Sequence, residues 1–198
     1  MKLVHLCERW LVVDKPPGWV VVPGRGSHPV LREALEAECG RIWVVHRLDA
    51  PVSGLILFAR TRDAHREANR AFEARAVEKT YEALTAGTGS SATWEWPLAQ
   101  GKKRVFVADH GKASNTCAVA LRRDERGQLW RLRPRTGRRH QLRVHAMTAG
   151  HPIHGDALYG SEISWKDGIA LRAVRLALEL PGLPPLLEVP GLCETIGT

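Results

Sequence analysis

The chain has 198 residues, a length that fits a single domain, or one domain folded as two lobes, without stabilising disulfides. Hydrophobic residues make up 44% of it, which is ordinary for a globular protein. Lysine and arginine number 29 against 21 aspartates and glutamates, which gives a formal net charge of +8. This excess predicts a polyanionic partner, either nucleic acid or an anionic membrane surface.

The cysteines Cys7, Cys39, Cys117 and Cys193 are widely scattered and form no C-x-x-C pair. This spacing argues against a zinc ribbon or a redox motif, and we expect reduced thiols in a cytoplasmic protein. The N-terminus has no apolar run long enough for a signal peptide, and no stretch approaches the length of a membrane span.

The first elements are short. The apolar pattern predicts strands at 10–14, 19–22 and 44–45, and a helix at 30–39 that ends at Gly40. The first strand is broken by Lys15-Pro16-Pro17-Gly18, since proline cannot donate a ladder hydrogen bond and glycine permits a turn.

The segment from Val45 to Ala59 reads V-H-R-L-D-A-P-V-S-G-L-I-L-F-A. Its apolar end, 55–59, predicts a strand that is covered on both faces, and Pro51 and Gly54 predict a turn before it. Asp49 lies in that turn. A carboxylate on a rigid loop beside a central strand is placed like a catalytic group. The alternative is an ordinary Asx-turn with Arg47 as its salt-bridge partner.

The next elements alternate in type. A helix is predicted from Arg62 to about Arg75, with Thr61 as its N-cap, followed by strands at 78–84, 105–107 and 116–121. A polar loop at 87–93 is a candidate boundary between two lobes, and Lys102, Lys103 and Arg104 form a small basic cluster. Apolar strands at 169–180 and 186–189 follow near the C-terminus.

The clearest alternation lies at 130–135. Trp130, Leu132 and Pro134 share one face of the predicted strand, and Arg131, Arg133 and Arg135 share the other. No acidic residue occurs from position 130 to 155. A basic stretch without counter-charges suits a phosphate backbone, which is bound chiefly by arginine, lysine and backbone N–H groups.

The segment after this strand predicts a turn entering a helix that ends near Gly150. Four histidines lie in or near it: His140, His145, His151 and His154. They leave a metal-dependent hydrolase open as an alternative. The strongest zinc pattern, a helical histidine pair with a glutamate base, is absent, so we expect no metal site.

Three separated segments carry a family resemblance. They read H-R-L-D-A-P-V-S-G-L at 46–55, E-K-T-Y-E-A-L at 78–84, and T-G-R-R-H-Q-L-R-V-H with G-H-P-I-H-G-D-A-L-Y-G at 136–145 and 150–160. In this order and spacing they closely resemble the RluA-type family of RNA pseudouridine synthases. The resemblance extends from D-K-P-P-G at 14–18 to the C-terminal strands, which is nearly the whole chain.

The resemblance implies a fold and a reaction. The fold would be α+β, with a mixed, largely antiparallel central sheet flanked by helices and a basic active-site cleft, built as one catalytic domain over residues 1–198. The enzyme would isomerise uridine within an RNA chain. The glycosidic bond from C1′ to N1 breaks, the uracil turns, and C1′ is rejoined to C5. The family needs no cofactor and no metal.

The resemblance also implies roles for individual residues. Asp49 matches the essential carboxylate, Tyr81 the tyrosine that packs on the uracil, and Arg143 the arginine that pairs with the catalytic aspartate. Arg47 matches the arginine that fills the gap left by the extruded base, and Leu142 lines the pocket. The remaining expected RNA contacts are His46, Arg131, Arg133, Arg135, Arg138, Arg139 and His140. The alternatives are an ordinary strand aromatic for Tyr81 and a surface helix residue for Arg143.

Two positions depart from the family pattern. Val52 stands where the family usually has threonine, and Arg172 stands where histidine is common. We expect no S4-like RNA-binding domain before residue 1, so the catalytic domain alone would select a structured rRNA or tRNA stem-loop. We expect a monomer that needs no protein partner and no membrane. A catalytically silent RNA-binding protein on the same scaffold is the second alternative.

Overall fold

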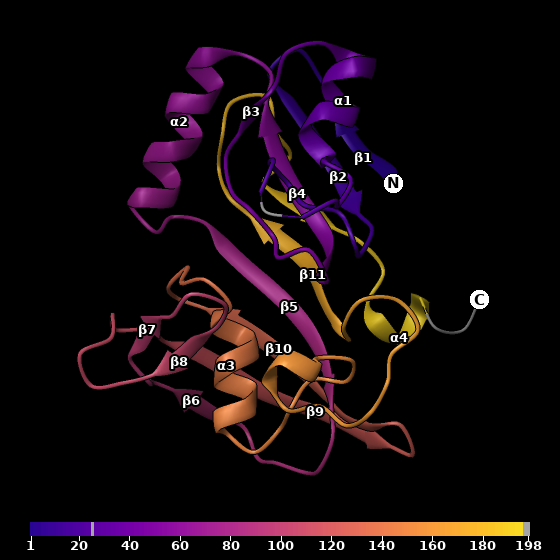
Figure 1. The fold of residues 1–198 in the computed structure, drawn as a ribbon. Helices are drawn as coiled ribbons and strands as arrows, with labels where there is room; N and C mark the ends of the chain where they lie inside the picture. Colours follow the sequence, from indigo (N-terminus) through magenta and orange to yellow (C-terminus); the bar gives the residue numbers. More distant parts are fainter. Residues whose placement is uncertain (25, 196–198) are drawn as a thin grey trace. The chain divides into compact units, whose positions relative to one another are not determined.

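The computed structural model describes residues 1–24 and 26–195, and the chain forms two compact units (Figure 1). Unit 1 contains Met1–Glu78 and Arg172–Pro190, and unit 2 contains Lys79–Leu171 and the chain from Gly191 onward. The expected lobe boundary at 87–93 is wrong. The strand β6 (Ala92–Trp94) begins within that segment and pairs with β9 (Thr116–Asp124) of the same unit.

Unit 1 is built on a mixed sheet. Strand β2 (Trp10–Lys15) pairs antiparallel with both β1 (Lys2–Leu6) and β4 (Ser53–Ala59), and β4 pairs in parallel with β11 (Leu171–Ala177). Two short strands complete it: β3 (Trp43–Val44) lies antiparallel to β4, and β12 (Leu186–Glu188) lies antiparallel to β11. This parallel pair brings the C-terminal part of the chain next to the strand that follows Asp49.

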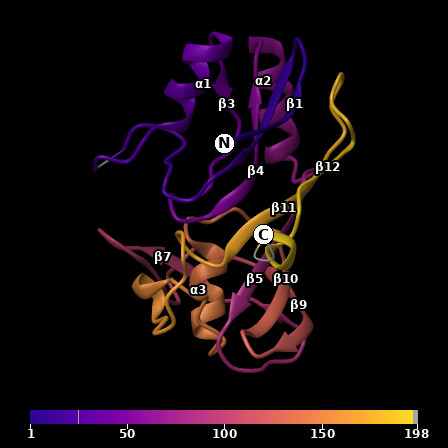
Figure 2. The ribbon, with the colours of Figure 1, turned by 90° about the vertical axis from the view of Figure 1, so that its right-hand side faces the viewer.

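Strand β4 is buried on both faces, as its apolar run predicts. Leu55 and Leu57 pack in one core with the helix α2 (Arg62–Glu73), and Ile56 and Phe58 pack in another with α1 (Leu31–Cys39). The two helices lie on opposite sides of the sheet (Figures 1 and 2). Each fully buried side chain of this size contributes roughly 1.5–3 kcal/mol. The start of α2 is confirmed too, since Thr61 Oγ1 accepts the N–H of Ala64 at 3.2 Å.

Unit 2 is built on an antiparallel sheet in the order β5 (Glu78–Thr85), β10 (Gly127–Pro134), β9 and β6. A separate two-stranded sheet joins β7 (Leu98–Gln100) to β8 (Val105–Val107). The helix α3 (Gln141–Thr148) packs with this small sheet around a core that includes Val144 and Tyr159. The short helices η1 (Ala157–Tyr159) and α4 (Leu192–Thr195) follow.

The predicted fold class is confirmed, because the chain is α+β with mixed, largely antiparallel strands. The strand expected at 19–22 is wrong, since only an isolated bridge from Val20 to Val30 forms there. The carbonyl of Trp19 instead accepts a hydrogen bond from the Lys15 ammonium group. The strand expected at 169–180 is shorter, as β11. Among the described residues, no helix is both long and apolar enough to cross a membrane.

Candidate active site

Asp49 lies in the turn that leads into β4 of unit 1. Its carbonyl oxygen accepts the N–H of Val52 at 3.1 Å, and its side chain is half-buried. Gly54 has a φ of 111°, and a Cβ at this position would lie 2.2 Å from the carbonyl oxygen of Ala173. Only glycine fits there. The turn before β4 is therefore fixed by backbone contacts, which gives Asp49 a rigid base.

Lys15 is fully buried beneath this turn. Its Nζ donates to the carbonyl oxygens of Pro16 and Trp19 at 2.9 Å and of Ala50 at 3.1 Å, and Ala50 also accepts the N–H of Gly18. Burial lowers the pKa of Lys15 to about 8, and the Asp49 carboxylate pulls this pKa in the opposite direction. Lys15 thus ties the turn to the loop after β2 and is a cation within electrostatic reach of Asp49. Sequence reasoning found its motif but not its role.

His46 and Arg47, the expected RNA contacts before Asp49, differ in burial and in their contacts. The Nε2 atom of His46 accepts the N–H of Leu57 at 3.0 Å, and its ring stacks on Phe72 with 5.2 Å between centroids. The orientation of this imidazole is therefore set by β4 and α2. Arg47 is exposed, as a residue that reaches for RNA must be. Their expected RNA contacts stay predictions.

The two departures from the family pattern both lie in unit 1. Val52 is buried, with 3% of its surface exposed. Arg172 is also buried, and its Nη2 donates to Asp14 Oδ2 at 2.6 Å while its Nε donates to the carbonyl oxygen of Pro190 at 2.8 Å. Asp14 precedes Lys15 in β2. Arg172 therefore joins the strand β11 to the segment that supports the Asp49 turn.

Tyr81 lies in the middle of β5 in unit 2, half-buried and directly opposite Leu132 of β10. Leu132 is in turn opposite Ala118 of β9, so these side chains share one face of the sheet. Thr116 is on the same face and accepts a hydrogen bond from Gln141 of α3. Tyr81 and α3 are therefore on the same side of the sheet.

The arginine row of β10 occupies the other face of that sheet. Trp130 and Leu132 are fully buried, Arg131 is half-buried, and Arg133 and Arg135 are exposed, so the predicted alternation is confirmed. Arg131 and Arg133 consequently point away from the face that carries Tyr81 and α3. If these arginines bind RNA, they do so on a separate surface of unit 2.

Arg143 is a buried residue of α3, with 5% of its surface exposed, so the alternative of a surface helix residue is wrong. Its Nε and Nη2 donate to the two carboxylate oxygens of Asp156 at 2.6 and 2.7 Å, and its guanidinium carbon lies 4.9 Å from the Tyr159 ring centroid. This bidentate geometry fixes the guanidinium plane. The neighbouring Leu142 is buried as well.

Sequence reasoning missed Asp156. The available signal was its place as the first acidic residue after the acid-free stretch at 130–155. A buried arginine needs a carboxylate or several acceptors nearby, because an unpaired buried charge is strongly unfavourable. Asp156 supplies that partner from the loop before η1.

The segment entering α3 carries the remaining expected RNA contacts. His140 has a φ of 52°, and its Nδ1 lies 2.7 Å from the hydroxyl oxygen of Tyr159, which also accepts the N–H of Val105. A non-glycine residue in this conformation is strained, and such strain clusters at functional sites. Arg138 and Arg139 are exposed.

A buried polar chain holds α3 to the sheet. Gln141 Nε2 donates to Thr116 Oγ1 at 2.9 Å, and that hydroxyl lies 3.0 Å from His145 Nδ1. On the other side of the ring, His145 Nε2 lies 2.8 Å from Ser114 Oγ, which donates to the carbonyl oxygen of Trp96. The chain is satisfied when Thr116 donates to Nδ1 and Nε2–H donates to Ser114. His145 is fully buried, and burial lowers its pKa.

The histidines form no evident metal centre. His145 uses both ring nitrogens in the polar chain, and the His151 ring packs on Trp130 with 4.9 Å between centroids. Within the part of the chain that the structure describes, no group of three or more histidine, cysteine or acidic side chains is arranged to hold a metal ion. The metal-dependent hydrolase therefore has no ligand set among these residues. Cys7, Cys39 and Cys117 are free thiols.

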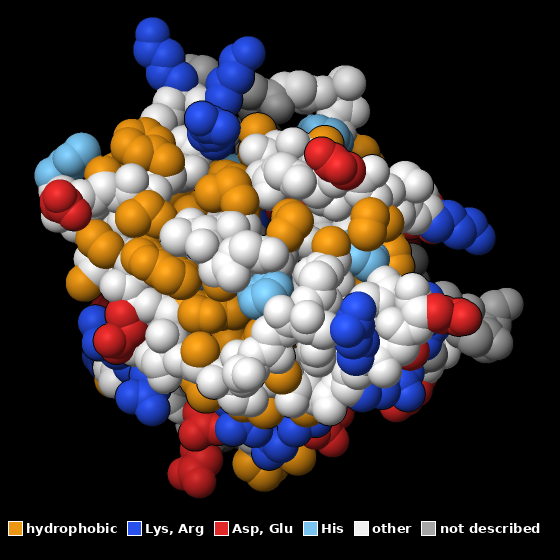
Figure 3. Space-filling view, turned by 90° about the horizontal axis from the view of Figure 1, so that it is seen from below, with side chains coloured by type: hydrophobic (Ala, Val, Ile, Leu, Met, Phe, Trp, Pro, Cys, Tyr) orange, Lys and Arg blue, Asp and Glu red, His pale blue; other side chains and the backbone are white. Residues whose placement is uncertain are grey.

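The expected site residues divide between the two units. Unit 1 holds His46, Arg47 and Asp49, and unit 2 holds Tyr81, Arg143 and the others. The expected proximity of Asp49 to Tyr81 and Arg143 joins residues of different units and stays a prediction. Basic side chains are spread over the molecule: on the face in Figure 3 they lie mainly at the edges, around a central area richer in apolar side chains.

Comparison with known proteins defines the class of this chain. Residues 9–148 match the sequence profile of the RNA pseudouridylate synthase family. The chain is 34% identical over 191 residues to the dual-specificity RNA pseudouridine synthase RluA of Vibrio cholerae, which covers 90% of this chain and 77% of the relative. The chain therefore belongs to the RNA pseudouridylate synthase family, whose members are isomerases.

Two further relatives sharpen this assignment. The ribosomal large subunit pseudouridine synthase D of Pseudomonas aeruginosa is 34% identical over 171 residues, which are 81% of this chain and 53% of that protein. The solved structure of human RNA pseudouridylate synthase domain containing 1 matches with a TM-score of 0.83 and 26% identity, over 96% of this chain and 82% of the human one. The fold is therefore that of pseudouridine synthases.

Proposed function

We propose that this protein converts uridine to pseudouridine within an RNA chain, with Asp49 as the essential catalytic group. The observation that carries the proposal is the position of Asp49. Its half-buried carboxylate stands on a turn fixed by Gly54 and by the Lys15 ammonium group, in a chain of the RNA pseudouridylate synthase family. A preorganised carboxylate can act as a nucleophile or as a base.

The reaction needs no redox change. The glycosidic bond between C1′ and N1 breaks, the uracil rotates, and a bond forms between C1′ and C5. The proton on C5 is then lost and N1 gains one, so the product is an isomer of the substrate. Asp49 has three candidate roles: attack on the ribose, attack on the base, or removal of a sugar proton.

Tyr81 and Arg143 complete the proposed catalytic set. A uridine in folded RNA must leave its stack before reaction, which costs a few kcal/mol. Stacking on an aromatic ring such as that of Tyr81 returns about 1–3 kcal/mol per base. Arg143 would pair with Asp49 and keep its carboxylate ionised in a water-poor pocket. The bidentate bond to Asp156 supports this role, because it orients the guanidinium group in advance.

The RNA would be held by the basic side chains of both units. In unit 1 we propose Arg47 for the gap that the extruded base leaves, with His46 beside it. In unit 2 we propose the segment before α3, with Arg138, Arg139 and His140, and Leu142 as an apolar wall. Arg131, Arg133 and Arg135 would contact RNA on the opposite face of the β10 sheet.

We propose a structured rRNA or tRNA stem-loop as the substrate. The relative from Pseudomonas aeruginosa is named for the large ribosomal subunit, which favours rRNA. The two units would act as one catalytic domain over residues 1–198, as a cytoplasmic monomer without a protein partner. Light scattering of the purified protein, with and without RNA, tests the monomer.

The decisive experiment tests the variant Asp49→Asn. It measures release of the C5 hydrogen as tritium from bulk RNA whose uridines are tritiated at C5. We expect no detectable turnover, while RNA binding stays within about threefold because the amide keeps the carboxylate's shape. Asp63→Asn is the matched control, since Asp63 is an exposed acid of α2 in the same unit. Substantial turnover by the Asp49 variant contradicts the proposal.

The joint action of the two units needs its own measurement. If Asp49 and Arg143 form a pair, the loss of unfolding free energy in the double variant with Asp49→Asn and Arg143→Met should be smaller than the sum of the losses in the two single variants. Fully additive losses would show that the two residues act independently.

Mapping pseudouridine in total RNA from cells with and without the gene then identifies the substrate. RNA binding without any isomerisation would instead favour the silent RNA-binding protein.

A further inference from the structure

Two hairpin turns of unit 2 each carry three basic side chains. The turn between β7 and β8 carries Lys102, Lys103 and Arg104. The turn end of the β9–β10 hairpin carries Arg122 and Arg123 in the last three residues of β9, and Arg126 in the turn itself. All six residues are exposed. The two turns are alike in charge and exposure, but they differ in the acidic groups around them.

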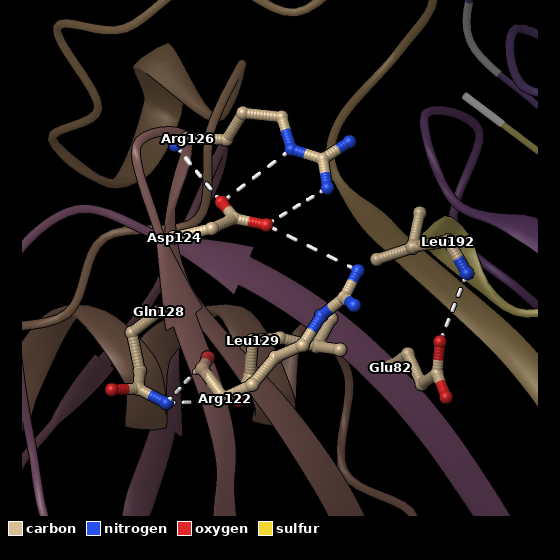
Figure 4. Close-up of polar contacts among 7 residues, drawn as sticks. All are labelled: Glu82, Arg122, Asp124, Arg126, Gln128, Leu129 and Leu192. Carbon is tan, nitrogen blue, oxygen red and sulfur yellow. Dashed lines mark hydrogen bonds and ion pairs between the residues drawn. The ribbon is translucent and has the colours of Figure 1, made fainter. Parts of the chain in front are cut away.

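The turn between β9 and β10 contains its own counter-charges. Asp124 accepts hydrogen bonds from the backbone N–H of Arg126 at 2.9 Å and from its Nη2 at 2.8 Å (Figure 4). The Nη2 of Arg122 lies 4.0 Å from the same carboxylate, and Glu125 adds a second acid beside it. These arginines are partly neutralised within their own turn.

The turn between β7 and β8 has no such acid. No aspartate or glutamate occurs from position 96 to 108. The N–H of Gly101 donates to the carbonyl oxygen of Arg104 at 2.9 Å, which closes a tight turn with Lys102 and Lys103 at its tip. A Cβ on Gly101 would lie 2.9 Å from that same carbonyl oxygen, so the turn is tight enough to crowd any other residue.

Two neighbouring segments add more positive charge to this turn. Arg139 Nη2 donates to the carbonyl oxygen of Lys103 at 3.3 Å, and Arg138 Nε donates to the carbonyl oxygen of Ala113 at 3.2 Å. Lys112 is tied to β7 by backbone hydrogen bonds with Leu98. We call the six exposed cations the basic turn surface: Lys102, Lys103, Arg104, Lys112, Arg138 and Arg139.

The charges of the basic turn surface are not neutralised by the protein. In the described chain, no carboxylate lies within ion-pair distance of any of the six, and the two arginine contacts are to neutral carbonyl groups. Like charges held together repel one another, and nearby phosphates relieve that repulsion while releasing counterions. A solvated surface more often carries both positive and negative side chains, as the turn between β9 and β10 does.

We propose that the basic turn surface binds the phosphate backbone of the RNA substrate, with Lys102, Lys103 and Arg104 as its main contacts. This inference rests on the proposed function for the identity of the polyanion. It adds a grip that depends on phosphate charge rather than on base identity, so it would serve any stem-loop that presents its backbone to α3 and β7.

The test compares two triple alanine variants that remove the same charge, one at Lys102, Lys103 and Arg104 and the other at Arg122, Arg123 and Arg126. The probe is a fluorescein-labelled RNA stem-loop, with Kd measured by fluorescence anisotropy over a salt series. Each lost phosphate contact should lower the slope of log Kd against log salt by about 0.7–0.9. We expect a loss of roughly 2–3 in slope for the first variant and less than about 1 for the second.

Catalysis provides an independent readout. With the same stem-loop as substrate, the first variant should raise KM at least tenfold and leave kcat within about twofold, since none of its residues belongs to the catalytic set. Two outcomes contradict the proposed role of the basic turn surface. One is an equal slope of log Kd against log salt for the two triple variants, and the other is a wild-type slope for the first variant. A variant at Lys102 and Lys103 alone, which keeps Arg104 and its turn, should give an intermediate slope and guards against misfolding.

The two proposals fail in distinguishable ways. Wild-type protein that binds the stem-loop but releases no C5 proton under any condition contradicts the proposed function alone. The salt slopes still decide the basic turn surface in that case, because they require binding and not turnover.

Discussion

Each unit of this protein contains a buried arginine–aspartate pair, and the two pairs are built differently. In unit 2, Arg143 makes a bidentate contact with Asp156, and the side chains are 6% and 1% exposed. In unit 1, Arg172 gives one nitrogen to Asp14 and another to the carbonyl oxygen of Pro190, and the pair is 8% and 16% exposed. The contact of Arg143 with Asp156 orients the guanidinium plane, whereas the contacts of Arg172 are divided between a carboxylate and a carbonyl group.

This difference suits the proposed catalytic role of Arg143 in unit 2 and a structural role of Arg172 in unit 1. A bidentate pair fixes the plane of the guanidinium group, which matters where that group must meet a reacting carboxylate. A divided contact fastens two chain segments together, here β2 and β11, and tolerates the loss of one partner better. Buried pairs add little net stability, but removal of one partner leaves an uncompensated charge. The cost should therefore be larger in unit 2.

The largest expected effect follows Asp156→Ala. It leaves the Arg143 guanidinium without its bidentate partner in a buried position, so the free energy of unfolding should fall by about 3–5 kcal/mol. Catalysis should fall at least a hundredfold in kcat, because the guanidinium loses its orientation. Denaturant melts and proton-release assays measure the two effects.

A shape-preserving variant separates orientation from folding. Asp156→Asn keeps one acceptor oxygen and should recover most of the stability but little of kcat. The expected role of Asp156 is wrong if this variant turns over at the wild-type rate.

Asp14→Ala should cost less than Asp156→Ala. Arg172 keeps its contact to Pro190, and the site is more exposed, so we expect a loss of about 1–3 kcal/mol. Arg172→His, which restores the residue common in the family, should be milder still. Chemical denaturation of the three variants under one condition gives the ranking, and a loss for Asp14→Ala equal to that of Asp156→Ala would remove the contrast between the units.

The sequence predicted the strands and helices of unit 1 better than the contacts that support the Asp49 turn. The apolar run at 55–59 identified β4, and Thr61 identified the start of α2, because both signals are local. Lys15 could not be interpreted in the same way. Its three acceptors are carbonyl oxygens at positions 16, 19 and 50, and backbone acceptors leave no trace in residue type.

In unit 2 the resemblance named the expected site residues, Tyr81 and Arg143, and the structure shows what surrounds them. Alternation at 130–135 gave the strand, but alternation cannot say which face meets α3, so the arginine row could not be placed relative to Tyr81. The pairing of Arg143 with Asp156 depends on a loop that folds back over 13 residues. Such a contact follows from tertiary structure and not from local periodicity.

Lys15→Met tests how the Asp49 turn is held in unit 1. It removes three hydrogen bonds but also removes a buried charge, so we expect a net loss of only about 1 kcal/mol at neutral pH. The effect on kcat should be larger, roughly tenfold, because Asp49 loses a rigid support and a nearby cation. An unchanged kcat with a stable fold would show that the turn does not need Lys15.

The pH dependence of stability gives a second readout for Lys15. Its pKa of about 8 in the folded protein lies below the 10.5 of the unfolded chain, so between these values the unfolded state binds the additional proton. Wild type should therefore gain stability relative to Lys15→Met as the pH rises from about 8 toward 10.5. Denaturant midpoints measured across this range provide the comparison.

The smallest expected effect concerns the polar chain that holds α3 in unit 2. Burial lowers the pKa of His145 below the 6.5 of the unfolded chain, so the unfolded state takes up a proton first as the pH falls. Stability from this residue is complete above pH 6.5 and is lost progressively below it. His145→Gln keeps a donor toward Ser114 and cannot titrate, so its unfolding free energy should fall less than that of wild type between pH 6.5 and 5.

His154 is the necessary control, because burial lowers its pKa as well, so its contribution to stability is also lost as the pH falls below 6.5. Removing it by His154→Gln should leave the His145 contribution in place, and the two contributions should add if the sites are independent.

The polar chain should also matter for catalysis, since His145 lies two residues from Arg143 on α3. Thr116→Val, which removes the hydroxyl donor to Nδ1, should therefore lower kcat more than KM, and a change confined to KM would place the effect in RNA binding instead.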